Sequence, residues 1–248
     1  MFTSDDKQPG LSGAFTVRVL GKTVELARAP GVFMPSRNGL FYSRSVRVHP
    51  GERVIDIGTG SGVLAIAAAK CGATACATDV DPRAVAAAQR NADLNGVAVE
   101  VRAGALFAGF AGPFDVILAN LPNEIVPPEY LAGLPPDDPR SFAGGVAGNE
   151  HLLALLGTAG PFLAPGGRLY LGVHSLTDYH ATLREAIRRF DTRLVDLEPL
   201  PVKPFVTANL EFYEALDAAG VIKVFRDDHG RWFSYGYLYE LRRPGAQE

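Results

Sequence analysis

The sequence of 248 residues is poor in cysteine, with only Cys71 and Cys76, and it has two methionines and one tryptophan. Two neighbouring cysteines do not supply the disulfide framework on which small secreted domains depend, so a reduced protein is favoured. No apolar run approaches the ~18 residues that a membrane-spanning helix needs. Residues 1–7 also lack the pattern of a secretory signal. We therefore predict a cytoplasmic protein without a membrane partner.

The sequence also lacks an excess of basic residues, because 24 lysines and arginines face 27 acidic residues and leave a formal net charge of -3. General nucleic-acid binding needs a basic footprint, so nucleic acid is disfavoured as a partner, while a local basic groove stays open. We find no metal-ligand spacing and no constellation of a serine or cysteine nucleophile. The prediction is therefore a protein without a metal site, whose oligomeric state is left open.

A glycine-rich stretch organises the rest of the sequence. Residues 54–57 form a short apolar run with β-branched side chains, as in a strand that is buried on both faces of a parallel sheet. Gly58, Gly60 and Gly62 then alternate before an alanine-rich helix that begins at Val63. Only glycine lets a backbone pass so close to a ligand, so this segment predicts a nucleotide-binding corner. A dinucleotide fingerprint would need glycine in place of Val63.

The segment Asp56-Ile57-Gly58-Thr59-Gly60-Ser61-Gly62 resembles motif I, D-x-G-x-G-x-G, of the class I S-adenosylmethionine (SAM) methyltransferases. In that family the glycine turn lies under the methionine part of the cofactor, and the carboxylate region attracts its ammonium group. The resemblance implies SAM as the cofactor, with a binding site that includes Asp56, Gly58, Thr59, Gly60 and Gly62.

A second strand over residues 73–78 ends at Asp79, about 20 residues beyond the glycines, as a ribose-binding acid requires. A carboxylate has two acceptor oxygens and can bind both ribose hydroxyls. Val80 would then cover one face of the adenine. The alternative is that Asp79 is only an acidic loop residue.

The next helix ends in Asn91-Ala92-Asp93-Leu94-Asn95-Gly96, which closely matches the N-A-x-L-N-G helix end of a methyltransferase subgroup. The subgroup includes release-factor glutamine methyltransferases, ribosomal-protein lysine methyltransferases and some guanine-amino rRNA methyltransferases. Its members usually carry G-D-L-F after the third strand, and the aspartate binds the adenine amino group. This sequence has Ala105 in place of the aspartate, so adenine is held by backbone groups at Ala105 or without this contact.

A strand over residues 114–119 is followed by a polar segment at the sheet edge where open α/β proteins bind ligands. The segment resembles the N-P-P-Y motif of glutamine and amino-adenine methyltransferases, in which asparagine orients a planar nitrogen toward the methyl group. The resemblance implies catalytic roles for Asn120 and Pro122, with Asn120 also in the cofactor site, and we predict that Asn123 and Glu124 bind the substrate. Asn123 stands in place of tyrosine, so the aromatic platform is missing. Alternatively, Asn120 only caps the strand.

Three further segments are expected to surround this core. Residues 15–26 alternate like a hairpin, which we expect to form a small flap against the main sheet. The loop over residues 30–42 either closes over a ligand, with Phe33 as a substrate-binding residue, or is a connector with buried aromatics. The proline-rich segment 127–149 is expected to roof the pocket of the methyl acceptor.

The C-terminal part predicts the rest of the sheet. Residues 163–171 resemble the L-x-P-G-G-x-L segment before the fifth strand of class I methyltransferases. An amphipathic helix is expected over residues 178–190, a sixth strand over 192–197 and a hairpin over 222–237, whose end fits an antiparallel seventh strand.

Together these patterns predict an α/β protein with a Rossmann-like, mostly parallel sheet of seven strands, the last of them antiparallel, and a small N-terminal β flap. We expect residues 1–45 to form a tail, hairpin and lid, and residues 46–248 to form the methyltransferase domain. The predicted function is SAM-dependent methylation of a nitrogen in a small molecule or an amino-acid side chain. Two alternatives stay open: methylation of an rRNA or tRNA base, and a non-catalytic scaffold with the SAM fold.

Overall fold

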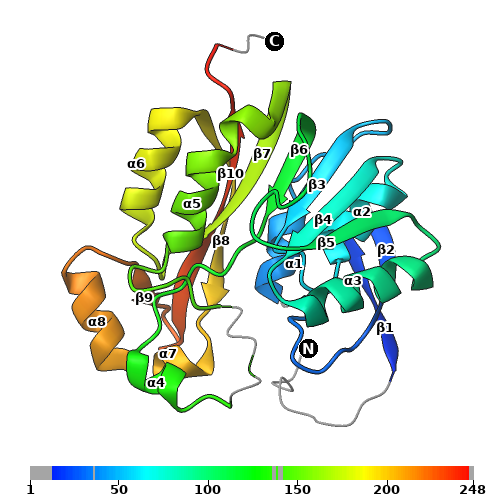
Figure 1. Ribbon diagram of the computed structural model, residues 1–248. Helices are drawn as coiled ribbons and strands as arrows, with labels where there is room; N and C mark the ends of the chain where they lie inside the picture. The colour runs from blue at the N-terminus through cyan, green and yellow to red at the C-terminus, as the bar shows by residue number, and fades with distance from the viewer. Residues whose placement is uncertain (1–12, 36, 136–137, 139–141, 246–248) are drawn as a thin grey trace.

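The computed structural model describes residues 13–35, 37–135, 138 and 142–245, and its centre is a sheet of eight strands (Figure 1). The spatial order is β5-β4-β3-β6-β7-β10-β8, and β9 pairs with β10 alone. The strands from β5 to β7 are parallel, whereas β10 runs antiparallel to β7, β8 and β9. The strand bounds are β3 (Arg53–Ile57), β4 (Thr74–Asp79), β5 (Val99–Ala103), β6 (Phe114–Ala119), β7 (Leu163–His174), β8 (Asp191–Pro201), β9 (Val224–Arg226) and β10 (Trp232–Arg242).

The predicted sheet is confirmed, including the antiparallel strand near its end. The predicted terminal hairpin is formed by β9 and β10, whose turn is closed by a hydrogen bond from Asp227 N–H to the Arg231 carbonyl (3.0 Å). β9 is an addition to the seven predicted strands. β10 continues well beyond the predicted hairpin, because it also fills the space between β7 and β8.

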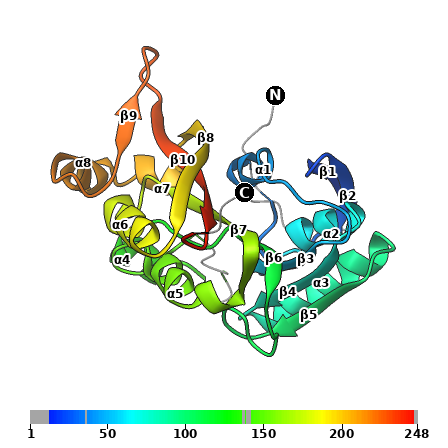
Figure 2. The ribbon, with the colours of Figure 1, turned by 90° about the horizontal axis from the view of Figure 1, so that it is seen from above.

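Successive residues of β3 point to opposite faces of the sheet and enter separate hydrophobic clusters. Val54 packs on the face covered by α2 (Val63–Lys70) and α3 (Pro82–Leu94). Ile55 and Ile57 pack on the face covered by α5 (Glu150–Thr158) and α6 (Tyr179–Arg189). Seen from above, the helices form two layers with the sheet between them (Figure 2). The parallel strands are therefore buried on both faces, as their apolar composition predicts.

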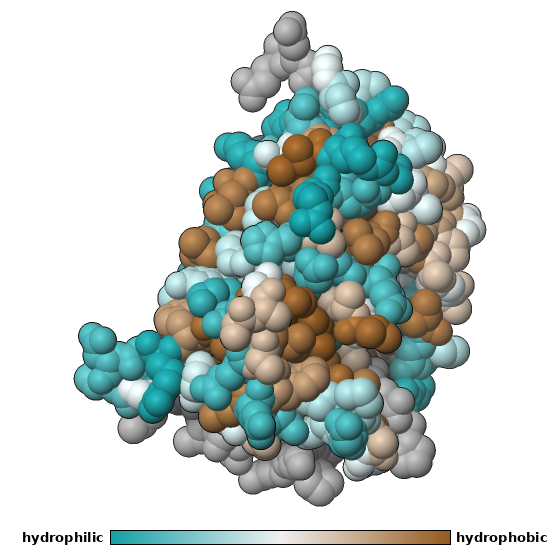
Figure 3. All heavy atoms as spheres, turned by 90° about the vertical axis from the view of Figure 1, so that its left-hand side faces the viewer, coloured by the Kyte–Doolittle hydropathy of each residue, from teal (hydrophilic) through white to brown (hydrophobic). Residues whose placement is uncertain are grey.

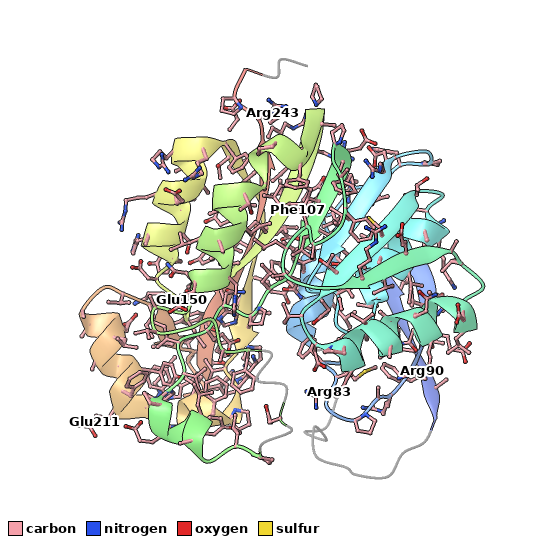
Figure 4. All side chains as sticks on the ribbon, in the orientation of Figure 1. Arg83, Arg90, Phe107, Glu150, Glu211 and Arg243 are labelled. Carbon is pink, nitrogen blue, oxygen red and sulfur yellow. The ribbon has the colours of Figure 1, made fainter. Side chains whose placement is uncertain are left out.

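Helix α3 begins at the predicted cap. Asp81 precedes Pro82, and its carboxylate accepts a hydrogen bond from Arg83 N–H (2.8 Å). Arg83 and Arg90 lie on the side of the helix away from the sheet (Figure 4). Small residues form the buried side, so the helix can approach the glycine turn closely.

The N-terminal hairpin, β1 (Ala14–Val19) and β2 (Lys22–Ala27), packs on helices and not on the sheet. The amide oxygens of Asn91 and Asn95 accept hydrogen bonds from the backbone N–H groups of Ala27 and Glu25 (2.9 and 3.0 Å). The flap therefore exists, but its expected place against the main sheet is wrong, because α2 and α3 already cover that face. The two asparagines of the N-A-x-L-N-G segment hold the hairpin in place.

Tyr42 lies in α1 (Arg37–Ser43), and its hydroxyl is inserted between the backbones of β6 and β7. The hydroxyl accepts a hydrogen bond from Ala119 N–H (2.8 Å) and donates one to the Tyr170 carbonyl (2.6 Å). The ladder between β6 and β7 ends at Ala119 and Leu171. Tyr42 is 1% exposed, so it satisfies two buried backbone groups where the strands part.

A third hydrophobic cluster, here called the side lobe, lies beside the ends of β7 and β10. It contains α4 (Pro128–Ala132), α7 (Pro204–Thr207) and α8 (Leu210–Ala218), seen at the lower left of Figure 1. Tyr213 joins its two chain segments by donating a hydrogen bond to the Ile125 carbonyl (2.9 Å). The buried members are Ile125, Val126, Leu176, Phe205, Val206, Tyr213, Ile222 and Val224.

The face shown in Figure 3 is mixed, with hydrophilic side chains around apolar ones that gather near its middle. Helix α6 has the predicted amphipathic character: Thr182 and Ala186 are buried, whereas Arg184 and Arg188 are exposed. Ile187, 62% exposed, is an apolar exception on the outer face. Within the described ranges, no helix is long and apolar enough to cross a membrane. The same residues contain no group of three or more histidine, cysteine or acidic side chains placed to hold a metal ion.

Replacing Tyr42 with phenylalanine should lower the free energy of unfolding by about 2–6 kcal/mol. The change removes only a hydroxyl, but it leaves the Ala119 N–H and the Tyr170 carbonyl unpaired in the interior, at about 1–3 kcal/mol each. Urea denaturation measures the difference. Tyr239→Phe is the matched control, because no hydrogen bond of the Tyr239 hydroxyl occurs among the described residues. Equal losses in both variants would contradict the bridging role.

Candidate active site at the carboxyl edge of the sheet

A cavity of about 380 Å³ lies at the carboxyl ends of the parallel strands, where the strand order reverses between β3 and β6. Open α/β sheets bind ligands at this position. The lining has two parts, which we call the glycine side and the Asn120 side. The glycine side contains Gly58, Gly60, Asp79, Val80 and Ala105, and the Asn120 side contains Asn120, Pro122, Glu124, Phe142, His174 and Lys203.

The turn after β3 has to be built from glycine. Gly58 (φ +70°), Gly60 (φ +56°) and Gly62 (φ +85°) adopt the left-handed backbone conformation. A Cβ at Gly58 would lie 2.6 Å from Leu121 Cδ2, and one at Gly62 would lie 3.0 Å from the Ala88 Cα. The turn therefore packs directly against α3 and against the loop that follows β6. Gly62 serves helix packing, while Gly58 brings the two sides of the cavity together.

Asp79 ends β4 and lines the cavity. Its two carboxylate oxygens accept hydrogen bonds from Gly60 N–H (2.8 Å) and Asp81 N–H (2.9 Å). Each oxygen keeps a further lone pair, so the oriented carboxylate can still accept hydrogen bonds from two neighbouring hydroxyls. This arrangement is compatible with the predicted contact to ribose, which stays a prediction.

The other residues of the glycine side offer apolar surface. Val80 is 72% exposed although it is apolar, and it lines the cavity together with Ala105. Phe33 lies over the glycine turn, because a Cβ at Gly60 would be 3.4 Å from the Phe33 carbonyl oxygen. The structure thus places Phe33 on the glycine side, away from the other predicted substrate residues. The reason is local: Val32 packs on α3 and holds this loop there.

Three predicted cofactor residues, Asp56, Thr59 and Gly62, do not line the cavity. Asp56 is 1% exposed, and its carboxyl group accepts a hydrogen bond from Thr59 Oγ1 (2.5 Å). Burial raises the pKa of Asp56 to about 7, although the hydrogen bond from Thr59 acts in the opposite direction. The carboxyl group braces the turn from inside the protein and does not face the cavity, so any effect on a bound cofactor is indirect.

Asn120 follows β6 and lines the cavity as a half-buried residue. Within the part of the chain that the structure describes, its side-chain amide makes no hydrogen bond. Its Oδ1 lies close to Gly172, 3.3 Å from where a Cβ of that residue would be. A strand cap would need a hydrogen bond to the backbone. The amide is instead available to a ligand, and Pro122 lines the cavity nearby.

Asn123 also lines the cavity, but both of its polar groups hold backbone atoms. Its Nδ2 donates a hydrogen bond to the Leu121 carbonyl (2.6 Å), and its Oδ1 accepts one from His174 N–H (2.6 Å). Asn123 therefore fastens the loop after β6 to the end of β7. Its predicted contact with the substrate would compete with this structural role.

Glu124 is joined on the Asn120 side by two residues that the sequence analysis did not predict. Lys203 Nζ donates a hydrogen bond to Glu124 Oε1 (2.7 Å), and His174 Nε2 lies 3.9 Å from the same oxygen. Burial lowers the pKa of His174, Glu124 raises it and Lys203 lowers it further, so the ring is uncharged at neutral pH. His174 could have been found from its place at the carboxyl end of a strand. No sequence signal connects Lys203 with Glu124.

Comparisons with known proteins agree with this geometry. Residues 41–127 match the family model described as "Ribosomal protein L11 methyltransferase (PrmA)". The ribosomal protein L11 methyltransferase of Thermus thermophilus is 35% identical over 174 residues, which cover 64% of this chain and 68% of that protein. The protein of the same name from Bacillus cereus is 51% identical over 82 residues, which cover 32% of this chain and 26% of that protein.

Solved structures share the fold at lower sequence identity. The T. thermophilus 16S rRNA N2 G1207 methyltransferase, solved with AdoMet and guanosine, has a TM-score of 0.56 and is 19% identical, covering 95% of this chain and 52% of that chain. A methyltransferase from Pyrococcus furiosus has a TM-score of 0.53 and is 20% identical, covering 89% of both chains.

The fold and the cavity define a class I SAM-dependent methyltransferase. The cavity fits SAM, because the glycine turn admits close backbone approach, Asp79 provides oriented acceptors and Val80 provides exposed apolar surface. Within this class, the chain belongs to the ribosomal protein L11 methyltransferase family.

Asp79→Ala should weaken SAM binding by about 1–3 kcal/mol, because charge-assisted hydrogen bonds to the ribose are lost. Isothermal titration calorimetry measures the affinity, and the melting temperature shows whether the turn survives the loss of the Gly60 hydrogen bond. Asp93→Ala on α3 is a control outside the cavity. Unchanged affinity in a folded Asp79→Ala protein would remove this residue from the cofactor site.

Asp56→Asn should change how stability depends on pH. The folded protein keeps the Asp56 proton up to about pH 7, whereas the unfolded chain loses it near the ordinary value of 3.8. The folded state therefore binds more protons in this window, and wild-type stability falls as the pH rises from about 4 to 7, by roughly 4 kcal/mol. Asparagine does not ionise, so the variant should gain stability relative to wild type across this window. Urea unfolding at both ends tests this, and parallel curves would refute it.

Proposed function

We propose that this enzyme methylates a nitrogen, and that the nitrogen is an amino group of a protein. The observation that carries the proposal is a pair of acceptors on the Asn120 side. The Asn120 amide has no internal partner, and Glu124 Oε2 is buried without a hydrogen-bond partner among the described residues. Amino nitrogen suits these groups best, because it presents N–H donors together with a lone pair, whereas a hydroxyl presents a single donor.

The substrate class follows from the relatives and from the shape of the pocket. The relatives in Thermus and Bacillus are named for ribosomal protein L11, and we propose that the substrate of this chain is also a protein. Phe142 of the predicted roof lines the cavity and stacks on Phe205 of the side lobe, with 5.2 Å between ring centroids. Such an apolar wall suits the four-carbon stem of a lysine side chain.

The glycine side and the Asn120 side have different roles in methyl transfer. SAM, when bound, supplies a methyl group that its sulfonium already activates. The protein has to align the acceptor nitrogen and keep its lone pair free. Asn120 Oδ1 can accept one N–H of that nitrogen and limit its rotation. The packing of Leu121 on Gly58 holds the loop that carries Asn120 against the glycine turn.

The substrate class is tested with methyl-labelled SAM, ribosomal protein L11 from the same organism and total RNA as competing acceptors. Label on a protein amino group, located by mass spectrometry, is the expected result. Label confined to RNA would overturn the proposal in favour of base methylation. A protein that is not stabilised by saturating SAM would instead be the non-catalytic scaffold.

Asn120→Ala should lower turnover on the true acceptor about 100-fold while it leaves SAM affinity nearly unchanged. An orienting contact acts mainly in the transition state, so its loss reduces turnover more than binding. Single-turnover methyl transfer and calorimetry with SAM measure the two quantities.

Asn120→Asp is the matched variant, since it keeps an acceptor oxygen but loses the amide donors and adds a charge. We expect it to retain or tighten SAM binding and to transfer methyl slowly. If Asn120 were only structural, both variants would lose melting temperature and activity together. Turnover close to wild type in a stable Asn120→Ala protein would disprove the alignment role.

A further inference from the structure

We propose that Glu124 and Lys203 form a clamp that binds an amine in its uncharged form, which deepens the proposed function and rests on it. Glu124 Oε2 accepts one N–H of the acceptor amine. Lys203, ion-paired to the other oxygen of the same carboxylate, disfavours the protonated amine. Both residues line the cavity on the Asn120 side.

The first observation is the state of the Glu124 carboxylate. Glu124 is 5% exposed, and its backbone is held by hydrogen bonds from its N–H to the Phe142 carbonyl (2.9 Å) and from Gly144 N–H to its own carbonyl (3.0 Å). Oε1 accepts the hydrogen bond from Lys203, whereas Oε2 has no partner among the described residues. A buried carboxylate oxygen without a donor is costly, so the position is suited to an N–H that arrives with the substrate.

The second observation is that Lys203 changes which form of an amine this oxygen binds. A lone buried carboxylate would stabilise an ammonium group, and an ammonium group has no lone pair with which to attack the methyl group. Lys203 Nζ lies 2.7 Å from Oε1 and faces the rings of Phe142 and Phe205 at 5.1 and 5.9 Å. A second cation at this site would meet a like charge beside an apolar wall. A cationic neighbour of this kind favours the free amine.

The other titratable groups around the pair come from four different elements. His174 ends β7, His151 lies in α5 and lines the cavity, Tyr130 lies in α4, and Tyr213 lies in α8. Burial lowers the pKa of His174, so that ring stays uncharged above neutral pH. Burial raises the pKa of Tyr213 well above its ordinary value, and its hydroxyl donates to the Ile125 carbonyl. Neither group changes its charge between pH 7 and 9.

The clamp also accounts for what happens to charge during transfer. The amine nitrogen attacks the methyl carbon, the N–C bond forms, the S–C bond breaks and its electron pair passes to sulfur. The positive charge of the sulfonium thereby moves to the nitrogen, which becomes a methylammonium group. This new cation faces Lys203, and the repulsion favours release of the product. The excess proton then passes to water.

The test uses the whole chain, saturated with S-adenosylhomocysteine, and n-butylamine as the probe. Butylamine carries the stem and amine of a lysine side chain, and NMR titration gives its affinity from pH 7 to 9. We expect the affinity for total butylamine to rise about tenfold per pH unit, because the uncharged fraction of an amine with a pKa near ~10.4 rises by that factor. n-Butyramide, which does not titrate here, should show no such rise.

Four variants separate the two residues of the clamp. Lys203→Met should abolish the pH dependence, because the carboxylate then accepts ammonium as well, and Lys203→Arg should preserve it. Glu124→Gln should weaken butylamine binding at least about tenfold at every pH. Lys223→Met is the matched control, since Lys223 forms an ion pair with Asp217 (3.1 Å) and does not line the cavity. If Glu124→Gln does not fold, the comparison of Lys203→Met with Lys203→Arg still tests whether the clamp selects the uncharged amine.

The possible results distinguish the clamp from the proposed function. Butylamine affinity that is flat between pH 7 and 9 in the wild type, or absent at pH 9, overturns the clamp even if the enzyme methylates protein amino groups. A pH dependence that survives in Lys203→Met overturns the role of that residue. A protein that binds butylamine as expected but methylates no nitrogen overturns the proposed function and leaves the clamp intact.

Discussion

Beside the active-site cavity the β6–β7 ladder ends at Ala119 and Leu171, and the Tyr42 hydroxyl, which lines the cavity, satisfies the backbone groups that this leaves. Parting two buried parallel strands leaves an N–H and a carbonyl without partners. One hydroxyl serves both, because it can accept and donate at the same time. Asn120 follows Ala119 directly, so this contact also sets where the Asn120 side begins. The N-terminal segment expected to act as a lid is thereby anchored in the sheet.

The site is built from side chains whose orientation is set by backbone atoms. Asp79 is held by one N–H group of the glycine turn, from Gly60, and one of its own turn, from Asp81. Asn123 ties the loop after β6 to β7. Glu124 is held through its own backbone, and Lys203 reaches it from the side lobe. Among the described residues of the Asn120 side, the Asn120 amide and Glu124 Oε2 make no hydrogen bond within the protein. The side lobe thus contributes the positive charge of Lys203, which pairs with Glu124.

Much of the fold followed from local patterns. Glycines with obligatory left-handed conformations, the Asp81-Pro82 helix start and the apolar strands each depend on neighbouring residues alone, so their positions were predictable. The placement of the hairpin was not, because its alternation shows one apolar face without showing what covers that face. Phe33 was assigned to the substrate for the same reason: nothing in its loop reveals that the loop packs on α3 beside the glycine turn.

The sequence by itself determined the class of the enzyme, its methyl donor and the strand ends at which chemistry takes place, since the motifs are contiguous and their backbone requirements are local. Only the tertiary structure decided which side chains face the cavity. It turned Asp56 into the interior, engaged Asn123 with the backbone, and brought Lys203 and His174 to Glu124 across 79 and 50 residues of chain. The reason is physical: burial and charge pairing depend on distances in space, and a sequence records only distances along the chain.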